Sequence, residues 1–399
     1  MDHLLEEPVV TYNQFNLSFT NYTRARKLEP LVKWAGGKER ELKYIIPNLP
    51  GYFEDYYEPF VGGGSVYTAI QARRYFINDK SHELIALYRT IVSGQRAVFF
   101  KAINGIVENW AVLGGISVKN QAFFVKMYNE FANGKTPKDR LLDGIDRFIL
   151  KNSVQLKGLF SPYFNLNIEN FLKEVKKNLV RKVLRMKVLE REKGKLPEKD
   201  ILDNIEAALK SAFYMHYRHI YNNHKTYGLD TALYTAIFLF IRNYTYSGMF
   251  RYNARGEFNV PYGGIAYNNK NFGKKIEYLK SAPLRQLLSK TKIVNADFEG
   301  FFEQNSPTEK DFIFLDPPYD SEFSTYAQND FVKPDQKRLA GYLMNDCRAK
   351  WMMITKNTDF IASLYTRPNV NISIFEKKYL VSFMNRNNKE TEHLLITNY

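Results

Sequence analysis

The chain has 399 residues, of which 45% are hydrophobic and 25% charged, and this composition is ordinary for a globular protein. Its 57 lysines and arginines exceed its 42 aspartates and glutamates, so the net charge of +15 favours a polyanionic partner such as nucleic acid, although a generally basic surface is the alternative. The single cysteine, Cys347, excludes a disulfide framework and a thiolate zinc site.

Near the amino end, residues 1–30 have no clear period and are expected to form an arm. Lys33-Trp34-Ala35-Gly36-Gly37-Lys38 follows and leads into a helical stretch that runs to about Ile46. The two glycines let the backbone approach a ligand closely, while Trp34 supplies a flat face and Lys38 a positive charge.

The segment from Tyr56 to Ser65 predicts a strand and a glycine loop, followed by a helix over 66–73. A second strand over 75–78 ends at Asp79. Glycines in the loop and an acid at the end of the next strand are typical of a nucleotide-type cofactor site, in which the acid accepts hydrogen bonds from ribose hydroxyls. A purely structural turn is the alternative.

A helix is expected over 81–92, with Ser81 as its cap. From about 98 to 225 the strand–helix alternation stops and apolar residues recur at helical spacing. One stripe includes Leu172, Val175, Leu179, Val183 and Met186, with lysines and arginines around it. Such a helix can lie along a phosphate backbone, and it can equally present a solvated face.

A helix over 230–243 leads into the segment 244–264, where arginines and aromatic residues alternate with glycine and asparagine turn signals. We expect a hairpin presented to a partner, because arginine reads guanine edges bidentately and aromatic side chains stack on bases. A structural hairpin with a decorated surface is the alternative.

The α/β pattern resumes with a strand at 293–294 and a mostly apolar strand over 311–315, which ends in Asp316-Pro317-Pro318-Tyr319. The prolines remove two amide donors, so that an acidic side chain and carbonyl oxygens can accept hydrogen bonds. These acceptors suit an exocyclic amine, with the ring of the same substrate stacked on Tyr319. A strand that ends in a proline turn is the alternative.

Beyond this motif we expect a helix from Pro334 and strands over 351–355, 372–375 and 392–398, the last able to form a hairpin with 379–383. Strands on both sides of the helical stretch favour one sheet with a long insertion.

Taken together and in this order, these motifs resemble the Dam-like, alpha-group (D12 class) DNA adenine-N6 methyltransferases. The resemblance covers about 31–100 and 225–399. It implies an α/β fold, a class I S-adenosylmethionine-dependent methyltransferase (Rossmann-like) mixed sheet with a large, mainly helical target-recognition insertion. The expected division is an arm at 1–30, a catalytic domain at 31–97 and 270–399, and a DNA-binding domain at 98–269 with its hairpin at 244–264.

The resemblance also implies roles for individual residues. The catalytic motif would be Asp316, Pro317, Pro318 and Tyr319. Cofactor-binding residues would be Trp34, Lys38, Glu58, Phe60, Gly62, Gly64, Asp79, Asp297, Phe298 and Asp316. In this set Asp79 would hold the ribose and Asp297 the cofactor adenine. DNA-binding residues would be Lys33, Tyr246, Ser247, Met249, Arg251, Asn253, Pro261 and Tyr326.

The implied cofactor is S-adenosylmethionine, without a metal, and the implied partner is double-stranded DNA. A cognate restriction endonuclease is left open as a second partner. The longest apolar run, near 232–241, is too short to cross a bilayer, so we expect no membrane contact and a cytoplasmic, nucleoid-associated monomer.

Two departures from the family limit what is carried over. Dam-type members usually have asparagine where Ser247 stands, and a basic and an aromatic residue where Gly264 and Ile265 stand. The stretch at roughly 136–225 has no counterpart in a minimal member. The recognition sequence GATC is therefore not transferred to this chain.

Other activities remain as alternatives. Cytosine-N4 enzymes resemble Ser-Pro-Pro-Tyr rather than Asp-Pro-Pro-Tyr, and cytosine-C5 methylation needs a thiolate, whereas we expect Cys347 to be a packing residue. Pro334-Asp335 with Glu376-Lys377-Lys378 loosely mimics a metal-dependent nuclease. A catalytically dead fold, and enzymes of RNA or protein glutamine that resemble Asn-Pro-Pro-Tyr, are the remaining alternatives.

Overall fold

The computed structural model describes residues 28–160, 163–319, 331–378 and 390–399. Its centre is a seven-stranded sheet with the order β3-β2-β1-β4-β5-β7-β6. The strands are β1 (Asp55–Glu58), β2 (Arg74–Asn78), β3 (Thr291–Val294), β4 (Phe312–Leu315), β5 (Lys350–Lys356), β6 (Asn371–Lys378) and β7 (Glu390–Thr397). Strands β1 to β5 pair in parallel, while β7 lies antiparallel between β5 and β6. The expected mixed α/β sheet is confirmed.

Strands β1 and β4 lie side by side at the point where the strand order reverses, because β2 and β3 extend the sheet to one side and β5 to the other. Tyr56 pairs with Phe312 and Tyr57 with Ile313. The two strands are parallel, so their carboxyl ends meet at the same edge. Such a switch point is where open α/β sheets bind ligands.

Two layers of helices cover the sheet. Tyr57, Ile313 and Trp351 pack with α12 (Phe298–Gln304), α13 (Lys333–Asn345) and α14 (Asp359–Tyr365). Tyr56, Phe312 and Met352 point to the other face, in a core shared with α1 (Leu42–Ile45), α2 (His82–Val92) and α11 (Ala282–Ser289). This alternation follows from the two-residue period of a strand.

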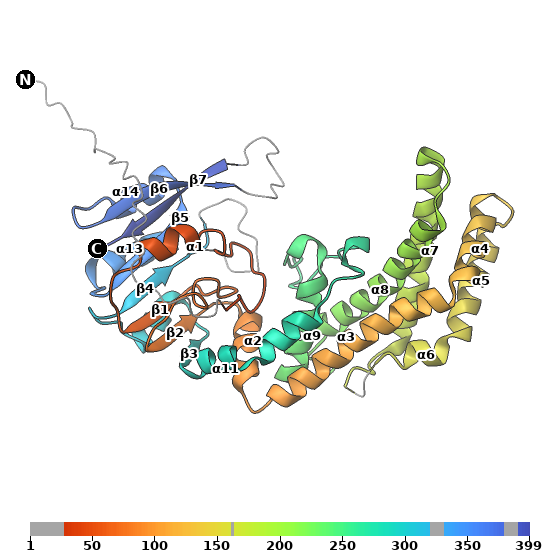
Figure 1. Ribbon diagram of the computed structural model, residues 1–399, viewed down its shortest axis with the longest axis horizontal. Coiled ribbons are helices and arrows are strands. Elements are labelled where there is room, and N and C mark those ends of the chain that lie inside the picture. Colours follow the sequence, from red (N-terminus) through yellow and green to blue (C-terminus); the bar gives the residue numbers. More distant parts are fainter. Residues whose placement is uncertain (1–27, 161–162, 320–330, 379–389) are drawn as a thin grey trace, which may run out of the picture.

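The expected helical stretch is confirmed between β2 and β3. It contains α3 (Arg96–Lys119), α4 (Gln121–Ala132), α5 (Lys138–Lys151), α6 (Ser153–Lys157), α7 (Ile168–Lys193) and α8 (Glu198–Asn222). The helix expected over 230–243 is α9 (Thr231–Tyr244), and α10 (Gly273–Lys280) follows before β3. The long helices α3, α7 and α8 extend away from the sheet (Figure 1). On α7, Val175 to Met186 of the predicted stripe are buried, but Phe171 replaces Leu172 at its start. None of the described helices is both long and apolar enough to cross a membrane.

Some local predictions were wrong. Residues 65–69 form turns rather than the start of a helix over 66–73, with one helix-like bond from the Thr68 amide to the Gly64 carbonyl. Here the tertiary structure overrides local propensity, because the Tyr67 hydroxyl is bonded to Thr291 on β3. The helix expected up to Ile46 contains only α1, followed by a 3-10 turn over Ile46–Asn48. Helices α10, α11, α12 and α14 were not predicted.

The expected hairpins are present in altered form. Within 244–264 the two arms meet at two isolated bridges, Thr245 with Tyr262 and Tyr252 with Phe258, rather than as continuous strands. Strand β7 pairs with β6, and the segment 379–383 lies outside the described residues.

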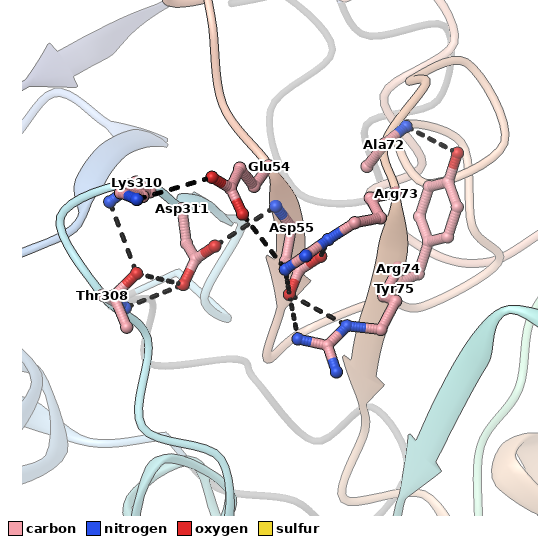
Figure 2. Close-up of polar contacts among 9 residues, drawn as sticks. All are labelled: Glu54, Asp55, Ala72, Arg73, Arg74, Tyr75, Thr308, Lys310 and Asp311. Carbon is pink, nitrogen blue, oxygen red and sulfur yellow. Dashed lines mark hydrogen bonds and ion pairs between the residues drawn. The ribbon is translucent and has the colours of Figure 1, made fainter.

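Charged residues form hydrogen bonds and ion pairs at the amino ends of the strands, opposite the switch point (Figure 2). Asp55 at the start of β1 accepts hydrogen bonds from Arg73 Nε at 3.0 Å and Arg74 Nη2 at 2.6 Å, and its backbone amide donates to Asp311 Oδ1 at 3.2 Å. Burial favours the neutral acid, but the hydrogen bonds from Arg74 and Arg73 outweigh it and lower the pKa of Asp55. These contacts join β1, β2 and the approach to β4, far from the switch point.

Candidate functional site

The glycine loop after β1 is held against the loop that contains Trp34. A Cβ atom on Gly63 would lie 2.2 Å from the Val32 carbonyl oxygen, and one on Gly64, whose φ is +85°, would lie 2.5 Å from the Tyr88 hydroxyl. Larger residues would push these segments apart. Gly62 lies against Trp34, and its carbonyl accepts a hydrogen bond from Tyr88 at 3.1 Å.

Asp79 follows β2 and faces the same loop. Its Oδ2 accepts a hydrogen bond from the Gly62 amide at 3.1 Å, and its Oδ1 accepts one from the Ser81 amide at 2.8 Å. Burial raises the pKa of Asp79 to about 6, against the lowering effect of these two bonds. The carboxylate is therefore fixed between the glycine loop and the start of α2, directly after the carboxyl end of β2.

Asn78, which the sequence did not single out, joins three strand ends. Its Nδ2 donates to the Pro59 and Ala296 carbonyls, both at 3.0 Å, and its Oδ1 accepts from the Ala296 amide at 2.9 Å. It is almost fully buried. These bonds fix the loops after β1 and β3 relative to Asp79.

The loop after β3 adds an aromatic cluster. The rings of Phe60 and Phe298 are 6.0 Å apart, and both lie within 6 Å of Phe331. Asp297 caps α12 by accepting from the Glu299 amide, and it lies 3.5 Å from Arg338 on α13. Arg338 was not predicted, and its charge balances the exposed acid.

Glu58, at the end of β1, is buried and accepts a hydrogen bond from the Tyr56 hydroxyl at 2.6 Å. Burial raises the pKa of Glu58 well above its usual range, against the effect of the Tyr56 bond, and the nearby charge of Asp316 adds to the rise. The side chain thus lies beneath the switch point rather than at its surface.

Asp316, directly after β4, forms an ion pair with Lys38, with Nζ 2.5 Å from Oδ2. Lys38 belongs to the first glycine loop, the segment 33–38 that precedes α1. Lys38 is 2% exposed, donates to the Gly36 carbonyl at 2.7 Å, and lies 5.3 Å from the centre of the Tyr319 ring. The predicted catalytic motif and the loop over 33–38 are therefore joined by the Lys38 side chain.

The motif itself rests on α13 and β7. Gln336 Nε2 donates to the Pro318 carbonyl at 3.0 Å, and the Tyr319 ring packs edge-on against buried His393 at 5.4 Å. Gln336, which the sequence did not single out, is fully buried on α13 and holds the turn that carries Pro317 and Pro318. Contacts with α13 and β7 thus hold the proline turn in place.

The residues predicted to bind DNA lie mainly on the surface of the hairpin. Tyr246, Ser247, Arg251 and Pro261 are exposed, and Met249 is half-buried. The Tyr246 amide donates to the Pro261 carbonyl at 2.9 Å, which joins the two arms. Tyr326 lies outside the described residues.

Two of these predicted residues also shape the hairpin. Arg251 Nε donates to Asn259 Oδ1 at 3.2 Å. The Asn253 side chain accepts from the Arg255 and Glu257 amides, both at 3.0 Å, so it organises the tip of the hairpin.

Lys33 and Trp34 are brought to the hairpin by Arg242, a buried residue of α9 that sequence reasoning missed. Arg242 donates to the carbonyls of Lys33, at 2.8 Å, and of Gly248, at 2.5 Å. An arginine inside an apolar helix was the available signal. The predicted cofactor loop and DNA-binding residues are consequently neighbours.

The described residues contain no group of three or more histidine, cysteine, aspartate or glutamate side chains able to hold a metal ion. Asp335, part of the alternative nuclease motif, accepts from the Val332 amide at 2.9 Å and from Arg338 at 2.8 Å, as expected for the start of α13. Cys347 is partly buried, and burial raises the pKa of its thiol to about 11. Both observations agree with structural roles.

A mainly parallel sheet with a glycine loop, an acid after β2 and Asp-Pro-Pro-Tyr at its switch point defines a class I methyltransferase. The chain belongs to the D12 class N6 adenine-specific DNA methyltransferase family, whose model matches residues 34–132 and 165–383. It is therefore an adenine-specific DNA methyltransferase, and this family supports adenine-N6 over the cytosine-N4 and nuclease alternatives. The family model leaves residues 133–164 unmatched, and these lie within or next to the stretch at roughly 136–225 that we expect to have no counterpart in a minimal member.

Two relatives cover more than nine-tenths of the chain. It is 25% identical over 390 residues to Type II methyltransferase M.MjaIII of Methanocaldococcus jannaschii, and this match covers 94% of this chain and 100% of the relative. It is 26% identical to Type II methyltransferase M.CviBI of Paramecium bursaria Chlorella virus NC1A, over 93% of this chain and 100% of the relative. The DNA adenine methylase of Escherichia coli K12 is 27% identical over 56% of this chain and 75% of its own.

Proposed function

We propose that the enzyme binds S-adenosylmethionine at the carboxyl edge of β1, β2 and β3 and methylates an adenine that has left the DNA helix. Asp79 would accept hydrogen bonds from the ribose hydroxyls, and Phe60 and Phe298 would pack on the cofactor adenine. The observation that supports this is the carboxylate of Asp79 between the Gly62 and Ser81 amides, next to a glycine loop that larger side chains would disrupt. Such residues fit a nucleoside.

The rest of the predicted cofactor set would surround the same edge, with Trp34, Lys38 and Gly64 on one side and Asp297 on the other. Asp297 would accept from the amine of the cofactor adenine. When bound, the cofactor supplies an electrophilic methyl group on a sulfonium. Glu58 would act from below, by supporting the strand end.

The catalytic motif would bind the target base. Tyr319 would stack on the adenine, whose amine is otherwise hidden in base pairing. Asp316 and the Pro317 carbonyl would accept hydrogen bonds from the two N–H groups of the amine, which localises its lone pair on nitrogen. Positioning of reactants can contribute on the order of 7–11 kcal/mol, so fixed acceptors suffice without a covalent intermediate.

Lys38 would have a second role in this arrangement. Its buried ammonium holds the Asp316 carboxylate at 2.5 Å and lies near the Tyr319 ring. It would therefore orient the acceptor before the base arrives.

Double-stranded DNA would bind across the hairpin at 244–264 and Lys33, with Arg251 reading a base edge. We assign residues 31–97 and 270–399 to the catalytic domain and 98–269 to the DNA-binding domain, with the arm at 1–30 separate. The enzyme would act as a monomer on nucleoid DNA. Because two relatives are named Type II methyltransferases, a restriction endonuclease for the same site is a candidate partner.

The test is methyl transfer from radiolabelled S-adenosylmethionine to duplex DNA by the purified protein. We expect N6-methyladenine in the DNA and complete loss of transfer in Asp316→Ala. Because this variant leaves the buried Lys38 ammonium without its carboxylate, its melting temperature should fall, and circular dichroism at the assay temperature checks that it is still folded. Asp335→Asn is the matched acidic control and should retain activity. Label found only in cytosine, RNA or protein would refute the proposal, as would magnesium-dependent cleavage of the DNA without methylation.

A further inference from the structure

One buried guanidinium joins the predicted cofactor loop to the predicted recognition hairpin. Arg242, in the last turn of α9, is 5% exposed. Its Nη2 donates to the Lys33 carbonyl at 2.8 Å, and its Nη1 donates to the Gly248 carbonyl at 2.5 Å. Lys33 precedes Trp34 in the first glycine loop, while Gly248 lies at the base of the hairpin. The two segments are thus held by one side chain.

The guanidinium is also enclosed by aromatic rings. Its central carbon lies 4.9 Å from the Trp34 ring centre and 5.0 Å from that of Phe250. The two rings are themselves 6.0 Å apart. Trp34 belongs to the predicted cofactor loop and Phe250 to the hairpin. The ring contacts of Arg242 therefore join the same two segments as its hydrogen bonds.

Burying this charge has a cost that a purely structural position would avoid. Burial lowers the pKa of Arg242 to about 10, and its Nε has no hydrogen-bond partner among the described residues. A methionine of similar length would fill the space without desolvating a cation. This cost indicates that arginine is needed here for its two hydrogen bonds, to the Lys33 and Gly248 carbonyls, rather than to fill space.

A second contact joins the same hairpin to the other side of the cofactor site. The Tyr252 hydroxyl donates to Glu83 Oε1 at 3.0 Å, and Glu83 Oε2 accepts from the Ser81 hydroxyl at 3.2 Å. The Ser81 amide in turn donates to Asp79 Oδ1 at 2.8 Å. This chain of hydrogen bonds runs from the hairpin to the acid predicted to hold the ribose.

The Arg242–Gly248 and Tyr252–Glu83 contacts flank, in sequence, the residue predicted to read a base. Gly248 and Tyr252 lie on either side of Arg251, on the first arm of the hairpin. The loop at Lys33 and the residue Asp79 are thus each connected by hydrogen bonds to the backbone that carries Arg251. Any coupling between two binding sites is reciprocal.

We propose that Arg242 and the Tyr252–Glu83 pair are positioning residues that couple cofactor binding to DNA binding. The proposal rests on the proposed function, because it takes the Asp79 edge as the cofactor site and the hairpin as the DNA surface. Neither Arg242 nor Tyr252 touches substrate. Each holds the hairpin against the cofactor loops. The bound cofactor and the bound DNA then favour the same position of the hairpin relative to these loops.

The experiment measures the Kd of S-adenosylhomocysteine with and without a duplex that the wild-type enzyme methylates. The ratio of the two values is the coupling, which we expect to be about tenfold in the wild type. Arg242→Met and Tyr252→Phe should bring the ratio towards one, while Kd without DNA changes less than about threefold. Arg242→Lys keeps the charge but not the fork, so it should also lose coupling.

Two matched controls hold the same hairpin from α8. Arg218 Nη1 and the Tyr214 hydroxyl both donate to the Val260 carbonyl, at 3.2 and 3.1 Å, without touching the cofactor loops. Arg218→Met and Tyr214→Phe should weaken DNA binding yet keep the wild-type ratio. Tyr252→Phe removes only one oxygen, so it remains informative if Arg242→Met does not fold.

A wild-type ratio of one overturns the proposal. An unchanged ratio in Arg242→Met and Tyr252→Phe, or an equal loss in Arg218→Met, overturns it as well. Wild-type protein that binds S-adenosylhomocysteine but no DNA would refute the proposed DNA surface, and the coupling would fall with it. Retained DNA binding without any cofactor binding would refute the proposed cofactor site in the same way.

Discussion

Lys38 and Asp316 form a buried ion pair across 278 residues of sequence, with Nζ 2.5 Å from Oδ2. The lysine comes from the first glycine loop and the aspartate from the turn after β4. Because these two segments flank the switch point, the pair joins the predicted cofactor loop to the predicted acceptor of the target amine. Lys38 thus contacts the predicted catalytic motif as well as its own loop.

We predict that Lys38→Met lowers kcat about 10- to 100-fold, since a hydrogen bond to a charged group contributes about 1.5–3 kcal/mol and this one orients Asp316. KM for DNA should change little, because the hairpin is untouched. Steady-state kinetics on duplex DNA is the measurement. Lys43→Met, which removes an exposed lysine beside Tyr44 on α1, is the control. Equal kcat in both variants would contradict the prediction.

Much of the site could be predicted because its residues follow strands directly. Asp79 and Asp316 each come after a short apolar run, and Ser81 has the position of a helix cap, so local pattern sufficed for all three. Asp55 illustrates the limit, since its role depends on arginines that meet it only when β1 and β2 pair. Local pattern places a residue on an element but not against its partner.

The remaining features depend on contacts between distant segments. Arg242 has an ordinary position near the end of an apolar helix, and only the folded chain brings Lys33 and Gly248 to it. Gln336 likewise meets Pro318 only after α13 packs on the sheet. The helix wrongly predicted over 66–73 has a good local pattern that the bond between Tyr67 and Thr291 overrides.

The affinity for S-adenosylhomocysteine should depend on the ionisation of Asp79. Its pKa is raised to about 6 by burial, and only the carboxylate can accept hydrogen bonds from both ribose hydroxyls. The affinity should therefore fall as the pH decreases through 6, by about fivefold or more between pH 7 and pH 5. Calorimetric titration at both pH values is the measurement.

Asp79→Asn should weaken binding about tenfold at pH 7 and remove this pH dependence, since the amide does not titrate. Asp55→Asn is the control, because Asp55 stands at the amino end of β1, whereas Asp79 follows the carboxyl end of the parallel strand β2. A pH dependence that survives in Asp79→Asn would assign it to another group.

Asp55→Asn should lower the stability of the protein without changing kcat. Burial opposes ionisation, but the bonds from Arg74 and Arg73 give Asp55 a lowered pKa in the folded protein. Its stabilisation is therefore present above the unfolded pKa near 4 and is lost as the pH falls through the folded pKa. We expect the free energy of unfolding to fall by about 1–2 kcal/mol at pH 7, measured by urea denaturation. A loss that is the same at pH 7 and pH 3 would contradict the role of the charge.

Ser247 has a backbone conformation that favours the asparagine usual at this position in Dam-type members. Its φ of 52° lies in the left-handed region, and Asn167 is the only other described non-glycine residue with a positive φ. Asparagine tolerates this region better than serine, and a β-branched residue tolerates it least. The asparagine usual in Dam-type members thus suits the turn, and serine adopts it under strain.

We predict that Ser247→Asn raises the free energy of unfolding by up to about 1 kcal/mol and that Ser247→Val lowers it by about 1–2 kcal/mol. Both side chains replace an exposed one, so packing changes little and the backbone conformation decides the sign. Urea denaturation of the two variants beside the wild type is the measurement. If Ser247→Asn and Ser247→Val shift stability in the same direction, side-chain contacts rather than the left-handed turn determine the choice of residue at this position.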